Sequence, residues 1–312
     1  MNVLITGATG FVGANLAHRL VKKGNKVHCV VRPKSDMWRI RSIKEKIVTH
    51  NADLSDARAI ERVVKNVHPQ VIYHMAAHGL FLKQEEAHQM ISSTILGTVH
   101  LFEALHKCNN VGKIISMGSF AEYDPTMIHI SEQSRLQPAN AYGVSKASQS
   151  FFAQYYARFY KMPIVIMRHA LLYGAYEEAR RLVPAAMLAH MRKEPLNLSS
   201  PRPRKDFLFM EDALDALELV VKKNIAPGEI INIGTGMEHT VRDVITMVQR
   251  VSGVRVPLRW DALERRQWDS PRRHVFETTQ TRILLHWRPR HTLEKGIQKT
   301  WDWFRNNHHL YE

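Results

Sequence analysis

Short apolar runs alternate with helix-like stretches along the first 170 residues of the chain. The helix-like stretches carry broad apolar faces, and the runs between them are apolar enough to be strands covered on both sides. This alternation predicts an α/β fold with a doubly wound parallel sheet. Strands are expected at 2–5, 26–31, 47–49, 71–74, 113–117 and 164–167, and long helices at 85–107 and 141–160.

The alternation breaks down after Tyr173-Gly174, where a second domain is expected to start. The later stretch contains a proline-rich, basic loop at 195–204 and a helix that Thr240 would cap. We therefore predict a smaller C-terminal α/β domain over 171–312, with segments of about 205–235 returning to the first domain. Its elements are expected as helices at 182–192, 212–222, 239–252 and 293–306 and a strand at 229–233.

The first strand runs directly into a glycine-rich turn that opens a helix. The glycines are spaced three apart, at Gly7, Gly10 and Gly13. Glycine lets the backbone approach a pyrophosphate closely, while the free amides and positive dipole end of the helix face the phosphates. Because the strand at 26–31 completes a βαβ unit, residues 1–170 are predicted to form a Rossmann-type dinucleotide-binding domain.

Lysine and arginine outnumber aspartate and glutamate by 44 to 29, for a formal net charge of +15. Such an excess indicates either an anionic partner or a generally basic surface. The arginines late in the chain suit a nucleotide diphosphate, because guanidinium groups match phosphate oxygens bidentately. Nucleic acid is not expected, since the chain has neither a recognised reading motif nor aromatic residues interleaved with the charge.

Cys29 and Cys108 are interpreted as packing residues, because neither has a CxxC or CxxH partner. No metal site is expected, since His74 with His78 lacks the third and fourth ligands. The first strand begins at Asn2 and no later run of about 20 uncharged apolar residues occurs, so no signal peptide or membrane span is expected. These features predict a soluble, cytoplasmic protein.

Tyr142 and Lys146 lie four residues apart and are expected on one face of a helix. A nearby ammonium lowers the pKa of a phenol and allows it to exchange a proton with a sugar oxygen near neutral pH. Ser119, at the end of the strand at 113–117, would donate a hydrogen bond to the same oxygen.

The glycine spacing, the Tyr-x-x-x-Lys pair and the preceding serine resemble the extended short-chain dehydrogenase/reductase superfamily, in its NAD-dependent epimerase/dehydratase (nucleotide-sugar) family. Later motifs extend the resemblance over nearly the whole chain: Lys205-Asp206-Phe207, Asn232-Ile233-Gly234-Thr235-Gly236, Trp287-Arg288-Pro289 and Leu293-Glu294-Lys295-Gly296. The resemblance implies an enzyme that acts on a nucleoside-diphosphate sugar, with Ser119, Tyr142 and Lys146 as its catalytic triad. It also implies a homodimer joined through the helices at 85–107 and 141–160.

The resemblance assigns further residues to the two ligands. Substrate contacts are implied for Arg181, Lys205, Arg266 and Asp269. Cofactor contacts are implied for Gly7, Thr9, Gly10, Phe11, Val12, Gly13, Arg32, Lys34, Ser35, Asp53, Leu54, Met75, Ala76, Ala77, Thr94, Tyr142 and Lys146.

The end of the second strand decides between NADP(H) and NAD(H). NAD-preferring members of the resembled superfamily carry an acidic residue there, whereas this chain has Arg32 followed by Lys34. A guanidinium and a nearby ammonium favour a 2′-phosphate. We therefore expect NADP(H), with NAD(H) as the alternative.

The segment after Ser119 separates the activities within the family. Ala121 stands where sugar-nucleotide 4,6-dehydratases carry a glutamate used for water elimination, so dehydration is not expected. The local pattern Gly-Ser-x-Ala-Glu-Tyr resembles 4-keto-6-deoxysugar reductases, although Glu122 can also be interpreted as a plain surface residue. The expected reaction is NADPH-dependent reduction of an NDP-4-keto-(6-deoxy)hexose at C4; the alternatives are an NDP-sugar 4-epimerase with tightly bound NAD and a non-catalytic dinucleotide-sensing regulator.

Three positions depart from the family pattern: Thr94 and Leu171 each replace an asparagine, and Ala175 replaces a proline. Thr94 retains the capacity for one hydrogen bond. His74 and His169 fall near the expected site, but a histidine at a strand end is more often a structural hydrogen-bond partner than an acid.

Overall fold

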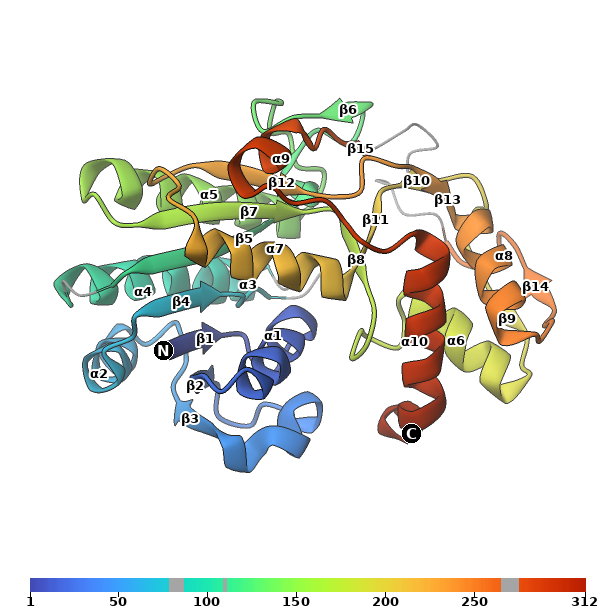
Figure 1. The fold of residues 1–312 in the computed structure, drawn as a ribbon, viewed down its shortest axis with the longest axis horizontal. Coiled ribbons are helices and arrows are strands. Elements are labelled where there is room, and N and C mark those ends of the chain that lie inside the picture. The colour runs from blue at the N-terminus through green and yellow to red at the C-terminus, as the bar shows by residue number, and fades with distance from the viewer. Residues whose placement is uncertain (79–86, 109–110, 265–274) are drawn as a thin grey trace. The chain divides into compact units, whose positions relative to one another are not determined.

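The computed structural model describes residues 1–78, 87–108, 111–264 and 275–312. Its centre is a seven-stranded sheet with the strand order β12-β7-β5-β4-β1-β2-β3 (Figure 1). The first strand is apolar and almost completely buried, because helices cover both of its faces. The strands are β1 (Asn2–Thr6), β2 (Lys26–Val31), β3 (Ile47–Asn51), β4 (Val71–His74), β5 (Lys113–Ser119), β7 (Ile164–His169) and β12 (Ile230–Ile233).

The strand order reverses direction between β1 and β4, as in a doubly wound fold. β1 pairs in parallel with β2 on one side and β4 on the other. The connections that leave the carboxyl ends of β1 and β4 therefore run in opposite directions along the sheet. Open α/β sheets bind ligands in the crevice between two such connections. The fold class predicted from the sequence is confirmed.

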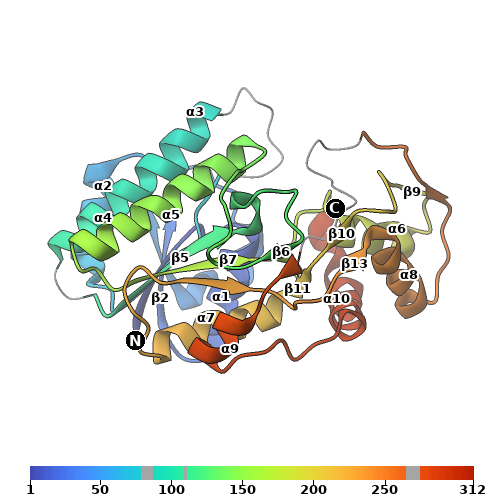
Figure 2. The same cartoon turned by 90° about the horizontal axis from the view of Figure 1, so that it is seen from above.

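Helices pack on both faces of this sheet. Figure 2 shows α2, α4 and α5 on one face and α1 on the other. On the first face, Ile60, Phe102 and Ala153 belong to one buried cluster with Leu4 and Ile72 of the strands. The helical elements are α1 (Phe11–Lys22), a 3-10 helix η1 (Trp38–Lys46), α2 (Ala57–Val67), α3 (Ala87–Met90), a π-helix η3 (Ile91–Leu96), α4 (Gly97–Lys107), a 3-10 turn η4 (Phe120–Glu122), α5 (Ala141–Phe159) and α7 (Met210–Lys222).

The chain divides into two compact units. The first comprises Met1–Tyr123, Arg135–Arg168 and Leu217–Ile231, and contains nearly all of the sheet. The second comprises Asp124–Ser134, His169–Ala216 and Asn232–Glu312.

The second unit has its own apolar core. Met187 of α6, Val248 of α8 and Phe304 of α10 are buried together. Asp206 is buried and accepts hydrogen bonds from the backbone amides of Thr235 and Gly236, which fixes the Gly-Thr-Gly turn. The unit's elements are β6 (His129–Ile130), β8 (Leu171–Tyr173), α6 (Leu182–Arg192), β9 (Leu196–Asn197), β10 (Arg204–Lys205), β11 (Phe207–Phe209), β13 (His239–Thr240), α8 (Val241–Ser252), β14 (Leu258–Arg259), β15 (Val275–Phe276), α9 (Thr279–Leu285), α10 (Leu293–Asn307) and η5 (His308–Tyr311).

Two element predictions need correction. The described part of the long helix predicted at 85–107 is not one regular helix, because a π-helical segment lies between α3 and α4; there the Thr98 hydroxyl donates to the carbonyl oxygen of Thr94. The loop predicted at 195–204 contains β9 and the start of β10, because short pairings with β14 and β13 order it. No helix in the described part of the chain is long and apolar enough to cross a membrane.

Candidate active site

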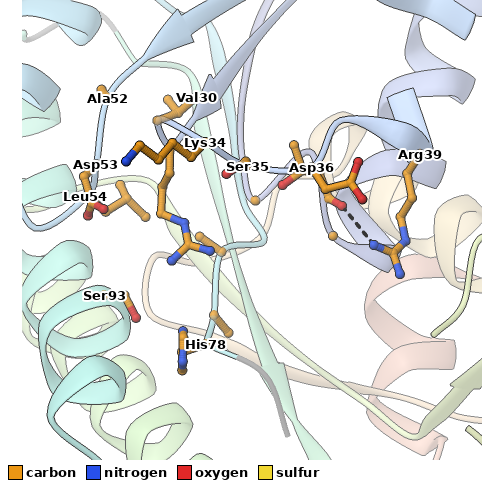
Figure 3. Close-up of a pocket in the computed structure, with 16 residues that line it drawn as sticks. Val30, Lys34, Ser35, Asp36, Arg39, Ala52, Asp53, Leu54, His78 and Ser93 are labelled. Atoms are coloured by element: carbon orange, nitrogen blue, oxygen red, sulfur yellow. Dashed lines mark hydrogen bonds between the residues drawn. The ribbon is translucent and has the colours of Figure 1, made fainter. Parts of the chain in front are cut away.

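A cavity of about 410 Å³ lies at the carboxyl ends of the central strands (Figure 3). Figure 3 shows Asp53 and Leu54 on one side of it and Asp36 and Arg39 on the other. Its volume is within the range of small-molecule sites. The lining residues are Gly7, Thr9, Gly10, Val30, Arg32, Lys34, Ser35, Asp36, Arg39, Ala52, Asp53, Leu54, Ala76, Ala77, His78 and Ser93.

The glycine-rich turn leaves no room for side chains. Gly7 has φ of +71°, and a Cβ added there would lie 2.7 Å from backbone atoms of Ala76. A Cβ on Gly13 would lie 2.2 Å from the carbonyl oxygen of Gly7, so the first turn of α1 packs directly on the loop. The turn is closed by a 3.0 Å hydrogen bond from the Gly10 amide to the Gly7 carbonyl oxygen. This is the close backbone approach that a pyrophosphate requires at a helix N-terminus.

Three cationic side chains line the cavity: Arg32, Lys34 and Arg39. Arg39 donates a 3.3 Å hydrogen bond to the carbonyl oxygen of Thr9, and its guanidinium lies 4.4 Å from the centre of the Trp38 ring. Arg39 was not among the cofactor residues expected from the sequence. In the sequence Arg39 is only a basic residue seven positions after Arg32. It reaches the glycine turn because the 3-10 helix η1 turns the chain back toward that loop.

Asp53 contributes the opposite charge. Although partial burial raises the pKa of its carboxyl group, hydrogen bonds from the Ser55 amide and hydroxyl and the charge of Arg32 lower that pKa below its usual value. The cavity thus combines acidic side chains, Asp53 and Asp36, which can accept hydrogen bonds from a ligand hydroxyl or amine, with cationic side chains suited to phosphate.

The cavity brings together most of the residues expected at the cofactor. Its lining includes Gly7, Thr9, Gly10, Arg32, Lys34, Ser35, Asp53, Leu54, Ala76 and Ala77. Among the described residues, the lining leaves out Phe11, Val12, Gly13, Met75, Thr94, Tyr142 and Lys146. It adds residues that sequence reasoning did not single out: Val30, Asp36, Arg39, Ala52, His78 and Ser93.

His74 links the end of β1, directly before the glycine turn, to the first turn of α4. Its Nδ1 lies 2.7 Å from the Thr6 hydroxyl and its Nε2 lies 2.9 Å from the Thr98 hydroxyl, and the ring is completely buried. Burial, with a smaller contribution from the charge of Lys146, lowers the pKa of His74 to about 3. The ring is therefore neutral at ordinary pH and acts here as a hydrogen-bond bridge.

Thr94 is also buried, and its hydroxyl accepts a 3.1 Å hydrogen bond from the backbone amide of His78. In the second unit, His169 is half-buried, with its Nδ1 2.7 Å from the carbonyl oxygen of Ala170. Among the described residues, no group of three or more histidine, cysteine or acidic side chains could hold a metal ion.

Ser119 ends β5 and caps the short turn that follows. Its side chain is buried, and its hydroxyl oxygen accepts a 3.2 Å hydrogen bond from the Ala121 amide. A hydroxyl that accepts in this way retains its own hydrogen for donation. The serine can therefore donate to a carbonyl oxygen placed at the end of the strand.

Helix α5 begins directly against this turn. The Asn140 side chain caps it by accepting a 2.8 Å hydrogen bond from the Gly143 amide. A Cβ on Gly143 would lie 2.2 Å from the carbonyl oxygen of Ala121, so only glycine permits this contact. The close approach brings the first turn of α5, which carries the half-buried Tyr142, to the segment that follows Ser119.

Lys146 is buried one turn further along α5. Its ammonium group donates to the carbonyl oxygen of Met117, two residues before Ser119, and to Gln149 Oε1 at 2.7 Å. Burial lowers the pKa of Lys146 to about 8, although the charge of Glu122 acts in the opposite direction. The lysine is therefore tied to the same strand end as the serine.

Glu122 is not a surface residue, so that interpretation of the sequence is wrong. Its side chain is fully buried and forms an ion pair with Arg168 at 2.7 Å. This burial is not visible in the local sequence pattern, because the partner of Glu122 lies 46 positions away on β7.

The residues assigned to the substrate fall in the second unit or outside the described residues. Arg181 directly precedes α6, and its side chain donates a 3.2 Å hydrogen bond to Glu177. Burial raises the pKa of Glu177 to about 7, although the charge of Arg181 opposes this. Lys205 is half-buried on β10. Arg266 and Asp269 lie outside the described residues.

The strand order, the glycine turn and the serine, tyrosine and lysine positions define an extended short-chain dehydrogenase/reductase. Residues 4–300 match the family model described as GDP-mannose 4,6 dehydratase, and the chain belongs to this family. Its members are NAD-dependent enzymes, and the chemistry that the comparisons support is that of a nucleotide-sugar oxidoreductase. The resemblance identified from the sequence is thereby confirmed at the level of the family.

Individual relatives carry several different activities. A human dTDP-D-glucose 4,6-dehydratase is 27% identical over 324 residues, which cover 99% of this chain and 91% of that protein. A trifunctional dehydratase/epimerase/reductase from Arabidopsis thaliana is 26% identical over 318 residues; these cover 98% of this chain but only 47% of that protein, so the chain spans about half its length.

Solved structures show the same fold. An epimerase from Methanothermobacter thermautotrophicus has a TM-score of 0.88 at 27% identity, with 99% of this chain and 93% of that chain covered. UDP-glucose 4-epimerase from Thermotoga maritima, solved with UDP-glucose, has a TM-score of 0.90 at 22% identity, with 98% and 99% covered. The expectation of a nicotinamide dinucleotide is supported, and the cavity with its glycine turn and cations fits such a group.

Proposed function

We propose that this chain is an NADPH-dependent reductase of an NDP-4-keto-(6-deoxy)hexose that acts at C4. One observation carries the proposal beyond the family: Arg32, Lys34 and Arg39 line the same dinucleotide cavity. Guanidinium and ammonium groups favour a 2′-phosphate, and NADPH supports net reduction. Ala121 stands where the resemblance places the glutamate of the dehydratases, and it is consistent with reduction without loss of water.

The catalytic roles fall to Ser119, Tyr142 and Lys146. When bound, the nicotinamide dinucleotide supplies the hydride that carbon C4 receives. The Ser119 hydroxyl donates a hydrogen bond to the carbonyl oxygen and stabilises the negative charge that develops there. Tyr142 gives its phenolic proton to that oxygen and completes the alcohol. Lys146 lowers the pKa of Tyr142 and contacts the nicotinamide ribose.

The remaining residues hold the two ligands. Gly7, Gly10 and the start of α1 would hold the pyrophosphate, and Asp53 and Leu54 would contact the adenosine part of the dinucleotide. We assign the contacts with the nucleoside-diphosphate sugar to Arg181 and Lys205 and, on the resemblance alone, to Arg266 and Asp269; residues 171–312 would form most of the substrate-binding domain.

A 4-epimerase is the second candidate, favoured by the epimerase structure that is 27% identical to this chain. The same three residues would oxidise C4 and, after rotation of the sugar, reduce it from the other face. Net turnover of the dinucleotide distinguishes the two. A reductase consumes added NADPH in proportion to the sugar reduced, whereas an epimerase keeps its dinucleotide through purification and consumes none.

The test is a panel of NDP-4-keto sugars mixed with NADPH, followed by its absorbance and by mass spectrometry of the sugar. We expect stoichiometric NADPH oxidation with at least one member of the panel, and loss of that oxidation in Tyr142→Phe. Interconversion of an NDP-hexose and its C4 epimer without NADPH oxidation would establish the epimerase instead.

A further inference from the structure

The Glu122 carboxylate joins three parts of the first unit at one point. Its Oε1 accepts a 2.7 Å hydrogen bond from the backbone amide of Ser119, and its Oε2 lies 2.7 Å from both the Ser150 hydroxyl and Arg168 Nε. We infer that Glu122 is a positioning residue that holds Ser119 at a fixed place relative to α5. This inference rests on the proposed function, in which Ser119 and the α5 residues Tyr142 and Lys146 act together.

The link to Ser119 is direct and short. The Glu122 side chain turns back onto the amide of Ser119 while the Ser119 hydroxyl accepts from the Ala121 amide, so each end of the turn fixes the other. The carboxylate therefore determines the direction of the last peptide of β5. If the peptide of Ser119 rotated, the Ser119 hydroxyl would move away from the substrate carbonyl oxygen to which it is proposed to donate.

The link to α5 is made one turn beyond Lys146. Ser150 donates its hydroxyl to the same carboxylate oxygen that binds Arg168, and all three side chains are buried. Arg168 is fixed in turn, because its Nη1 donates a 2.9 Å hydrogen bond to the Tyr123 hydroxyl and its guanidinium lies 4.8 Å from the centre of that ring. The carboxylate thus has partners on β5, α5 and β7.

The carboxylate packs directly against the backbone of Gly118, where there is no room for a side chain. A Cβ on Gly118 would lie 2.6 Å from Glu122 Oε1 and 2.7 Å from Arg168 Cγ. The three hydrogen bonds to Glu122 given above are all donated to its carboxylate, from an amide, a hydroxyl and a guanidinium. A glutamine of the same shape would turn an NH₂ group toward at least one of these donors. Glu122→Gln therefore keeps the volume but breaks the hydrogen-bond pattern.

The experiment is a double-mutant cycle between Glu122→Gln and Ser119→Ala, with kcat, KM and NADPH affinity measured for each enzyme. Ser150→Ala is the milder second variant, because it removes one donor and leaves the buried ion pair intact. Ser148→Ala is the matched control: it removes the same atom from α5, but that hydroxyl donates to the Val144 carbonyl oxygen on the exposed side.

We expect Glu122→Gln to lower kcat at least tenfold and Ser150→Ala to lower it about threefold, with KM and NADPH affinity within about twofold of wild type. In the Ser119→Ala background, both effects should shrink to less than about twofold, because the positioned group is gone. Ser148→Ala should match wild type.

Two outcomes would overturn the inference, and they are distinguishable. If Ser119→Ala lowers kcat but the losses from Glu122→Gln and Ser150→Ala persist in full in its background, Glu122 does not act through Ser119 and the proposed function stands. If Ser119→Ala alone leaves kcat unchanged, the proposed function fails, and the positioning role fails with it. Should Glu122→Gln not fold, the Ser150→Ala cycle gives the same decision.

Discussion

Lys146 keeps its ammonium group in a fully buried position with two hydrogen-bond acceptors, Met117 O and Gln149 Oε1. Burial penalises the charged form and lowers the pKa of Lys146 from 10.5 to about 8. The proposed role in tuning Tyr142 requires the charged ammonium, which is the predominant form below pH 8. The lowered pKa also has a measurable effect on stability, which does not depend on the substrate.

Because the folded pKa lies below the unfolded one, the unfolded chain binds more protons between pH 8 and 10.5. The unfolding free energy of the wild type, relative to Lys146→Met, should therefore be flat below pH 8. It should then rise with pH across that window by up to about 3 kcal/mol. Urea unfolding of both proteins at several pH values measures this difference. A difference that does not change between pH 7 and 10 would show that Lys146 has an ordinary pKa.

Arg39 should contribute to the choice of NADP(H) over NAD(H). Replacing it with alanine removes one cation from the cavity, and we expect NADPH affinity to fall about tenfold while NADH affinity changes little. Fluorescence titration with each dinucleotide measures both. Lys44→Ala is the control, since Lys44 lies exposed on the same 3-10 helix and does not line the cavity. Equal losses for NADPH and NADH would reject the role in 2′-phosphate recognition.

At the scale of single residues, the sequence predicted what is local and missed what is distant. That Gly7, Gly10 and Arg32 line one cavity was predictable, because their positions follow from a short strand, a turn and a strand end. Arg39 and Glu122 were not, because the first depends on how a 3-10 helix turns back and the second on a partner 46 positions away. The catalytic roles of Ser119, Tyr142 and Lys146 stay predictions.

At the scale of elements, the N-terminus of α5 is the critical one for the proposed chemistry. Its cap, Asn140, lies two residues before Tyr142 and accepts from the Gly143 amide at 2.8 Å. Helix α8 has an equivalent cap, in which Thr240 accepts from the Asp243 amide at 3.0 Å. Because only α5 carries proposed catalytic residues, a comparison of the two caps separates an effect on stability from an effect on activity.

Removing either cap should lower the unfolding free energy by about 1 kcal/mol, because one helix amide loses its acceptor. Only Asn140→Ala should also lower kcat, by several-fold, since it loosens the turn that carries Tyr142. Thermal unfolding and steady-state kinetics of Asn140→Ala and Thr240→Ala measure both quantities. Comparable kcat values in the two variants would argue against a positional role for the α5 terminus.

Element predictions succeeded where periodicity was strong. β2 (Lys26–Val31) and α6 (Leu182–Arg192) have the predicted bounds, and the Thr240 cap is confirmed. The π-helical segment η3 could not be predicted, because a helix with one extra residue in a turn keeps nearly the same apolar pattern. The short strands β9 and β10 were missed since pairing with distant strands, not local sequence, orders them.

At the scale of the whole molecule, one face of α5 is apolar and exposed. Phe151, Tyr155 and Phe159 lie along it, with 58%, 43% and 73% of their surfaces exposed. We propose that this face joins two copies of the chain, as the family resemblance implies. Exposed aromatic residues at helical spacing on one face are a common feature of such contacts.

Phe151→Asp should place a charge in the proposed contact and shift the protein from dimer to monomer. Light scattering after size-exclusion chromatography measures the mass directly. Met237→Asp, at an exposed methionine in the second unit, is the control and should leave the mass unchanged. A wild-type protein that is monomeric at micromolar concentration would contradict the proposal.

The sequence predicted the family and the fold class of the whole molecule, because the glycine spacing, the Tyr-x-x-x-Lys pair and the late motifs are spread over nearly the full length. It did not decide between reductase and epimerase, since both use the same residues. The domain boundary at 170–171 stays a prediction, as do the substrate contacts of Arg266 and Asp269, which lie outside the described residues.

The most direct test of the central claim is transfer of deuterium from NADPH, labelled on either face of nicotinamide C4, to a bound NDP-4-keto sugar. Mass spectrometry and NMR of the product locate the label. The account predicts one deuterium at sugar C4 from one of the two labelled forms with the wild type, and none with Tyr142→Phe. A wild-type enzyme that binds the sugar and NADPH together but leaves C4 without deuterium would contradict it.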